Sequence, residues 1–85
     1  MQESNPILGE QFKELIWNQI KNNDPPITKE TYHRLVSEGF DENETIRLMA
    51  CVVSTETYYV LKYKRPFDEK RYEKMMRKLP KMPWD

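Results

Sequence analysis

The apolar residues of the chain recur at the spacing of amphipathic helices and divide the sequence into four segments. Around residues 6–22, one broad face carries Leu8, Phe12, Leu15, Ile16, Gln19 and Ile20. Two prolines, at positions 25 and 26, then prevent the helix from continuing. The pattern predicts a first helix at about 6–22, with Asn5 and Pro6 suited to its cap and first turn.

The stretch DPPITKETYHRLV, residues 24–36, is interpreted as the start of the second helix. Thr28 can accept a hydrogen bond from a free backbone N–H at a helix start, and Ile27 can pack on Tyr32 as a hydrophobic staple. Gly39 is expected to end this helix, because glycine readily takes the left-handed conformation. The second helix is thus expected at about 28–38.

A similar stretch, KRPFDEKRYEKMM at residues 64–76, predicts the last helix at about 68–79. Asp68 stands at the capping position, and Phe67 is expected to pack on Tyr72. Several apolar positions also match at an offset of forty residues. We therefore interpret the chain as two similar helical hairpins.

The longest helix is expected at about 42–63, where Asp41 and Glu44 have the spacing of a capping box. One stripe of this helix holds Ile46, Met49, Ala50, Val53, Thr57, Val60 and Leu61, and a nearly opposite stripe holds Leu48, Val52, Tyr59 and Tyr63. A helix that is apolar on two sides has neighbours on both. The predicted fold is all-α, a compact four-helix arrangement built from two similar helical hairpins around a long central third helix, with a tail at 80–85 laid over the surface.

The length of 85 residues fits one small domain, residues 1–85. Its formal net charge is zero, but residues 1–61 hold five Lys/Arg and ten Asp/Glu, whereas residues 62–85 hold nine and four. Such asymmetry is typical of a basic surface for nucleic acid or an acidic membrane. More often it reflects two parts that attract each other within the fold or across a dimer.

Several kinds of site lack the residue types that they need. Cys51 and His33 are the single cysteine and histidine, so neither an internal disulfide nor a structural metal site is expected. Two glycines are too few for a phosphate-binding loop, and we expect no cofactor. We find neither a secretory signal nor an apolar run that could span a membrane, so we expect a reducing, cytoplasmic location without membrane association.

Three residues are weak candidates for catalysis. Glu56 lies between the two apolar stripes of the third helix, where burial would raise its pKa and suit it to acid or base chemistry. More often, a tyrosine hydroxyl, an arginine or a backbone amide holds such a carboxylate in place. His33 could titrate near neutral pH, but the sequence shows no catalytic partner for it. Tyr59 is the third candidate. Cys51 is interpreted either as an accessible thiol or as a small packing residue.

Aromatic residues outside the predicted core are candidates for an interface. Trp17 points away from the main stripe of the first helix, and Trp84 lies in the tail, so each either anchors a partner or covers the core. Tyr58 and Lys62 belong to a C-terminal region where tyrosines alternate with basic residues, a composition that suits nucleic acid. Acidic residues interrupt that region, and the chain's pI of about 6.6 is lower than nucleic-acid-binding domains usually have.

The segments NQIKNNDPPITKETYHRLVSEGF and IRLMACVVSTETYYVLK resemble a family of small, mostly helical bacterial proteins classed as a domain of unknown function. The similarity extends from about Asn5 to Leu79 and depends mainly on helix ends and core positions. It implies a bacterial, cytoplasmic helical protein and supplies no catalytic residue, cofactor or substrate.

From the sequence we expect a non-enzymatic module that binds another protein or a second copy of itself. The alternative is nucleic-acid binding through the basic C-terminal third. A third hypothesis is a small enzyme with a site between helices.

Overall fold

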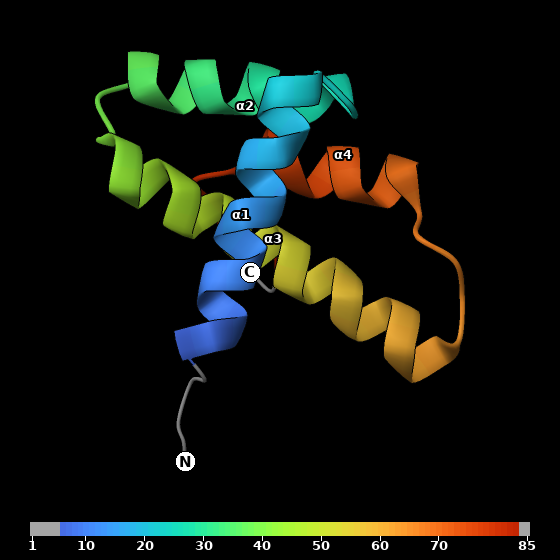
Figure 1. The fold of residues 1–85 in the computed structure, drawn as a ribbon. Coiled ribbons are helices and arrows are strands. Elements are labelled where there is room, and N and C mark those ends of the chain that lie inside the picture. Colours follow the sequence, from blue (N-terminus) through green and yellow to red (C-terminus); the bar gives the residue numbers. More distant parts are fainter. Residues whose placement is uncertain (1–5, 84–85) are drawn as a thin grey trace.

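The computed structural model describes residues 6–83, with side chains from residue 10 onward, and contains four helices (Figure 1). They are α1 (Pro6–Asn22), α2 (Pro26–Ser37), α3 (Glu42–Tyr63) and α4 (Glu69–Lys78). No strand occurs in this range, so the predicted all-α, four-helix class is confirmed. The described residues do not include the expected cap at Asn5 or the interface candidate Trp84. They also do not include the side chain of Leu8, whose packing was expected.

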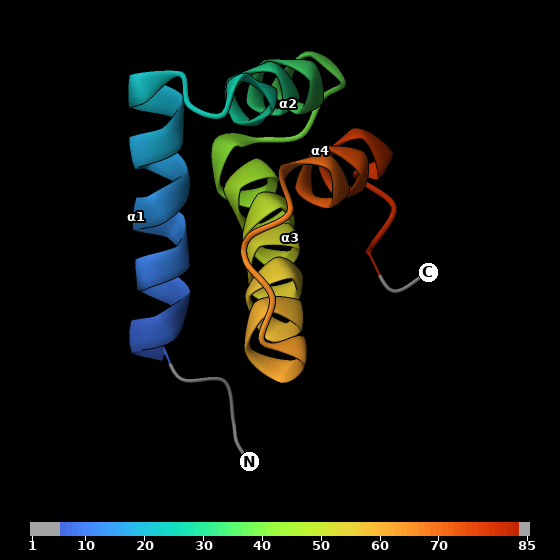
Figure 2. The same ribbon diagram turned by 90° about the vertical axis from the view of Figure 1, so that its right-hand side faces the viewer.

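The long helix α3 contacts each of the other three helices, and α2 also contacts α1 and α4. Figures 1 and 2 show the two shorter helices, α2 and α4, side by side, whereas the two longer ones, α1 and α3, cross in the view of Figure 1. Each half of the chain therefore consists of a longer helix followed by a shorter one. The predicted central place of the third helix is confirmed.

The two similar stretches start their helices by different chemistry. α2 begins at Pro26, two residues earlier than predicted, because a proline in the first turn has the right φ and lacks an N–H that would have no partner there. The predicted cap at Thr28 is therefore wrong, and Ile27 lies inside the helix rather than before it as a staple. The Thr28 side chain is fully buried instead, and its Oγ1 donates to Gln19 Oε1 at 2.7 Å.

The predicted caps at Asp41 and Asp68, the contact of Phe67 with Tyr72 and the stop at Gly39 are confirmed. Asp41 accepts a hydrogen bond from the Glu44 amide at 2.7 Å, and Asp68 accepts one from the Arg71 amide at 3.0 Å. The rings of Phe67 and Tyr72 lie 5.1 Å apart, as a staple at the start of α4 requires. Gly39 follows α2 with a φ of +107°, a conformation that an L side chain rarely adopts.

The core is formed by the N-terminal two-thirds of α3 together with apolar faces of the other helices. α3 contributes Ile46, Leu48, Met49, Val52 and Val53, and α4 contributes Tyr72, Met75 and Met76 at helical spacing, followed by Leu79. Of the expected surface tail, Met82 packs against this core.

The last turns of α3 depart from the prediction of a helix covered on both sides. Every residue from 61 to 70 is exposed, including Leu61 and Tyr63. The reason is the crossing of α1 and α3, which carries the C-terminal end of α3 away from its neighbours in Figure 1. The apolar stripe thus continues beyond the helices that cover it.

Candidate binding cleft

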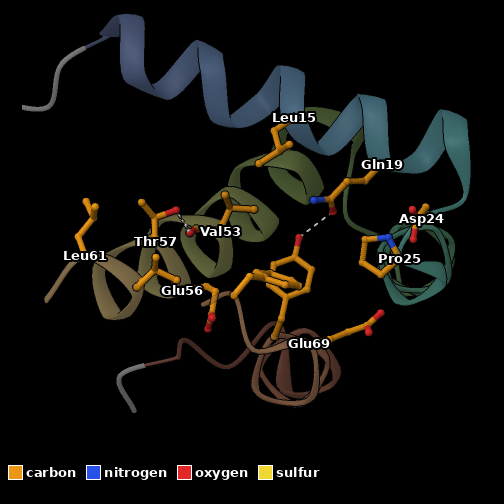
Figure 3. A pocket seen from close by; sticks show the side chains of 12 residues that line it. Leu15, Gln19, Asp24, Pro25, Val53, Glu56, Thr57, Leu61 and Glu69 are labelled. Atoms are coloured by element: carbon orange, nitrogen blue, oxygen red, sulfur yellow. Dashed lines mark hydrogen bonds between the residues drawn. The ribbon is translucent and has the colours of Figure 1, made fainter. Parts of the chain in front are cut away.

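An open cleft of about 540 Å³ lies between α1, α3 and the segment that enters α4 (Figure 3). Its apolar lining residues are Leu15, Pro25, Val53, Val60, Leu61 and Phe67. Leu15, Leu61 and Phe67 are large apolar residues with exposed fractions of 42%, 73% and 49%. Three exposed apolar side chains from three segments therefore converge on one concave surface, which we call the α1–α3 cleft.

The polar side of this cleft is held by Gln19. Its Oε1 accepts a hydrogen bond from the Tyr72 hydroxyl at 2.9 Å, drawn as a dashed line in Figure 3, and another from Thr28. One side-chain oxygen thus joins α1, α2 and α4. Burial raises the pKa of Tyr72 to about 12, although its bonds to Thr28 and Gln19 act in the opposite direction. The hydroxyl therefore keeps its proton and remains a donor at neutral pH.

One end of the cleft is acidic. Asp24 and Glu69 line it together, and Figure 3 shows both on the side away from Leu61. Among the described residues, no lysine or arginine lines the cleft, and neither carboxylate has a cation within ion-pair distance. The two acidic residues therefore lie at one end of the cleft, whereas the apolar Leu61 lies at the other end and Leu15 between them.

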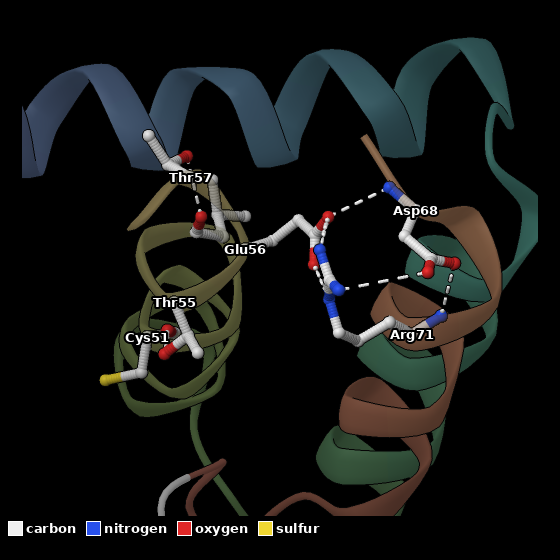
Figure 4. Close-up of polar contacts among 7 residues, drawn as sticks. Cys51, Thr55, Glu56, Thr57, Asp68 and Arg71 are labelled. Atoms are coloured by element: carbon white, nitrogen blue, oxygen red, sulfur yellow. Dashed lines mark hydrogen bonds and ion pairs between the residues drawn. The ribbon is translucent and has the colours of Figure 1, made fainter. Parts of the chain in front are cut away.

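Glu56, the third carboxylate of the lining, is only 3% exposed and is fully engaged (Figure 4). Its Oε1 accepts from Arg71 Nε at 2.8 Å, and its Oε2 accepts from Arg71 Nη2 and from the Asp68 amide, both at 2.9 Å. Hydrogen bonding to this carboxylate raises the pKa of the Arg71 guanidinium. The contact fixes the start of α4 to the middle of α3.

The three weak catalytic candidates do not converge. Glu56 and Tyr59 both contact Arg71, whose guanidinium carbon lies 4.9 Å from the centre of the Tyr59 ring. His33 is exposed on α2, with its ring 5.6 Å from that of Tyr32, and does not line the α1–α3 cleft. The Glu56 carboxylate is thus held by an arginine and a backbone amide, two of the structural partners expected from the sequence.

The interface candidates lie on other surfaces. Trp17 packs edge-on against Tyr32 of α2, with ring centres 5.4 Å apart, and is nearly opposite Leu15 on the α1 helical wheel. Lys62 Nζ lies 5.3 Å from the centre of the Tyr58 ring and 5.5 Å from that of Tyr63, a cation–π cluster at the end of α3. Neither group belongs to the cleft.

Cys51 is half-buried, and this burial raises the pKa of its thiol, which favours a packing role over reactivity. Residues 6–83 contain no group of three or more potential metal ligands. No helix in this range combines the length and the apolar character needed to cross a membrane.

The sequence had already placed Leu15, Val53, Val60, Leu61 and Gln19 on apolar faces, but it did not identify the cleft. A helical wheel shows that residues share a face and not whether a neighbour covers it. Asp24 and Glu69 were missed as site residues, because charged residues beside helix ends are common and carry no specific signal.

Comparisons with known protein families, with curated proteins and with solved structures gave no match to this chain. The resemblance to a bacterial helical family therefore stays a prediction.

Proposed function

We propose that this chain is a non-enzymatic helical module that binds another protein through the α1–α3 cleft. The observation that carries the proposal is the convergence of Leu15, Leu61 and Phe67, all large, apolar and exposed, on one concave surface. Single exposed apolar residues are common on proteins, but a cluster of them around a cleft is typical of an interaction site.

The construction of the cleft also suits binding. Its polar side is fixed by the hydrogen bonds of Gln19, and its α4 side is fixed by the contact of Glu56 with Arg71. A surface that is already ordered loses little conformational entropy when a partner binds. The engagement of both Glu56 oxygens supports a structural role for this carboxylate and gives less support to an enzyme. The single, half-buried Cys51 is compatible with the cytoplasmic location that we propose.

A phage-displayed library of random peptides, selected on the immobilised wild-type protein, tests this function. Selected peptides should bind wild type and should lose binding to Leu61→Glu, because a carboxylate placed in the cleft makes apolar contact costly. Val36→Glu is the matched control, since Val36 is also apolar and exposed but lies outside the cleft. Failure to select any peptide that distinguishes these variants counts against the proposal.

Nucleic-acid binding is the second candidate, and one observation favours it. Tyr58 and Tyr63 are exposed at the end of α3 beside Lys62, and Arg65 lies 5.8 Å from the Tyr63 ring. On α4, however, Arg71 and Arg77 are paired with carboxylates, which leaves less positive charge for phosphates. A salt series with labelled single-stranded DNA and RNA on the same immobilised protein decides, because phosphate contacts weaken steeply as salt rises.

A further inference from the structure

We infer that the occupant of the α1–α3 cleft is a short peptide segment of a partner protein in which a large apolar side chain is followed closely by a lysine or arginine. This inference rests on the proposed function and names the partner class. It arises from the two unlike ends of the cleft, an apolar one at Leu61 and an acidic one at Asp24 and Glu69 (Figure 3).

The charges that line the cleft determine whether a cationic or an anionic ligand is favoured. The carboxylate of Glu56 is neutralised by Arg71, but Asp24 and Glu69 have no such partner among the described residues. Both are exposed, so they lose little hydration in the free protein and are available to a cation. An anionic ligand would meet two like charges, whereas a cationic one would gain from both.

The apolar lining of the cleft determines the other half of the ligand. Leu15, Leu61 and Phe67 offer apolar surface that an aliphatic or aromatic side chain would cover, and this burial would supply most of the affinity. A volume of about 540 Å³ is in the range of small-ligand pockets and accommodates a few side chains rather than a whole helix. An apolar anchor with a neighbouring basic residue therefore fills both ends at once.

A second copy of this chain fits less well. An acidic cleft would need a basic counterpart on a different surface of the second copy, such as the region of residues 62–81. Within that region Arg71 and Arg77 already pair with carboxylates of their own chain, which leaves less positive charge for the cleft of a second copy. A separate partner protein with an unpaired basic residue fits better.

The sequences of the selected peptides and their affinities test the inference. We expect an apolar residue next to Lys or Arg to be enriched over the unselected library. Representative peptides, labelled and measured by fluorescence polarisation, should bind Asp24→Asn/Glu69→Gln about twofold to tenfold more weakly than wild type, the range expected for exposed charge pairs. Glu30→Gln/Glu73→Gln removes the same charge elsewhere and should leave the affinity unchanged.

The outcomes separate this inference from the proposed function. Peptides that depend on Leu61 but show no basic enrichment, and bind the Asp24/Glu69 variant normally, would overturn the inference and leave a protein-binding cleft. Absence of any Leu61-dependent peptide overturns both. Light scattering that shows self-association abolished by Leu61→Glu would make a second copy the occupant and would also overturn the inference.

Discussion

Glu56 is the buried charge on which the junction between α3 and α4 depends. Both of its oxygens accept hydrogen bonds, from two nitrogens of Arg71 and from the Asp68 amide. Glu56→Gln keeps the shape of the side chain but replaces one accepting oxygen by an amide that donates. That amide then faces N–H groups of Arg71 or Asp68, so a bond is lost and two donors are brought together.

The expected cost follows from these contacts. A hydrogen bond to a charged group contributes about 1.5–3 kcal/mol, and a buried group left without its partner costs more. Arg71 is 28% exposed, so water compensates part of its loss. We expect Glu56→Gln to lower the free energy of unfolding by about 2–3 kcal/mol, a large share of the 5–15 kcal/mol typical of small domains.

A double-mutant cycle measures whether this cost belongs to the pair. Urea denaturation of wild type, Glu56→Gln, Arg71→Gln and the double variant should yield a coupling energy of about 1–2 kcal/mol. Glu73 and Arg77 provide the matched control, because they form an exposed pair at 3.8 Å whose coupling should stay below about 1 kcal/mol. If Glu56→Gln costs no more than Glu73→Gln, the junction does not depend on this contact and our reasoning is wrong.

Two further predictions concern buried hydroxyl groups. Tyr72 has a pKa of about 12 in the folded protein against 10 for a free tyrosine, so its contribution to stability is present below pH 10 and is lost as the unfolded chain ionises. Relative to Tyr72→Phe, the wild-type free energy of unfolding should fall by up to about 1.4 kcal/mol per pH unit between those values, and parallel pH profiles would contradict this. The Thr45 hydroxyl is buried without a hydrogen-bond partner among the described residues, so Thr45→Val should raise the free energy of unfolding by about 1 kcal/mol in the same urea assay. Thr28→Val, which removes a bonded hydroxyl, should lower it, and equal losses in both variants would refute the assignment.

Helices and most of their ends could be predicted because they depend on local chemistry. The bounds of α1 and α3 coincide with the ranges expected from apolar spacing, and Asp41 and Asp68 act at short range as caps. The start of α2 was misjudged because two adjacent prolines indicate both the end of one helix and the first turn of the next. The local sequence pattern alone does not decide whether such prolines end one helix or begin the next.

The cleft and its fixed carboxylate depend on tertiary geometry, which the pattern does not contain. Glu56 was placed between apolar stripes, and an arginine or an amide was among its expected partners. Nothing in the spacing indicated Arg71, fifteen residues away and beyond a connection. Likewise, the apolar stripe of α3 that ends at Leu61 predicted contact with a neighbouring helix along its whole length. The crossing of α1 and α3 instead leaves the last part of this stripe exposed.

Gln19 shows how the fold and the cleft depend on each other. A glutamine in an apolar stripe is costly unless its oxygen and amide find partners, and here the oxygen accepts from both Thr28 and Tyr72. Because these donors belong to α2 and α4, the oxygen fixes the distances among three helices. The same side chain lines the cleft. The polar contact that holds the helices in place therefore also sets the shape of the surface offered to a partner.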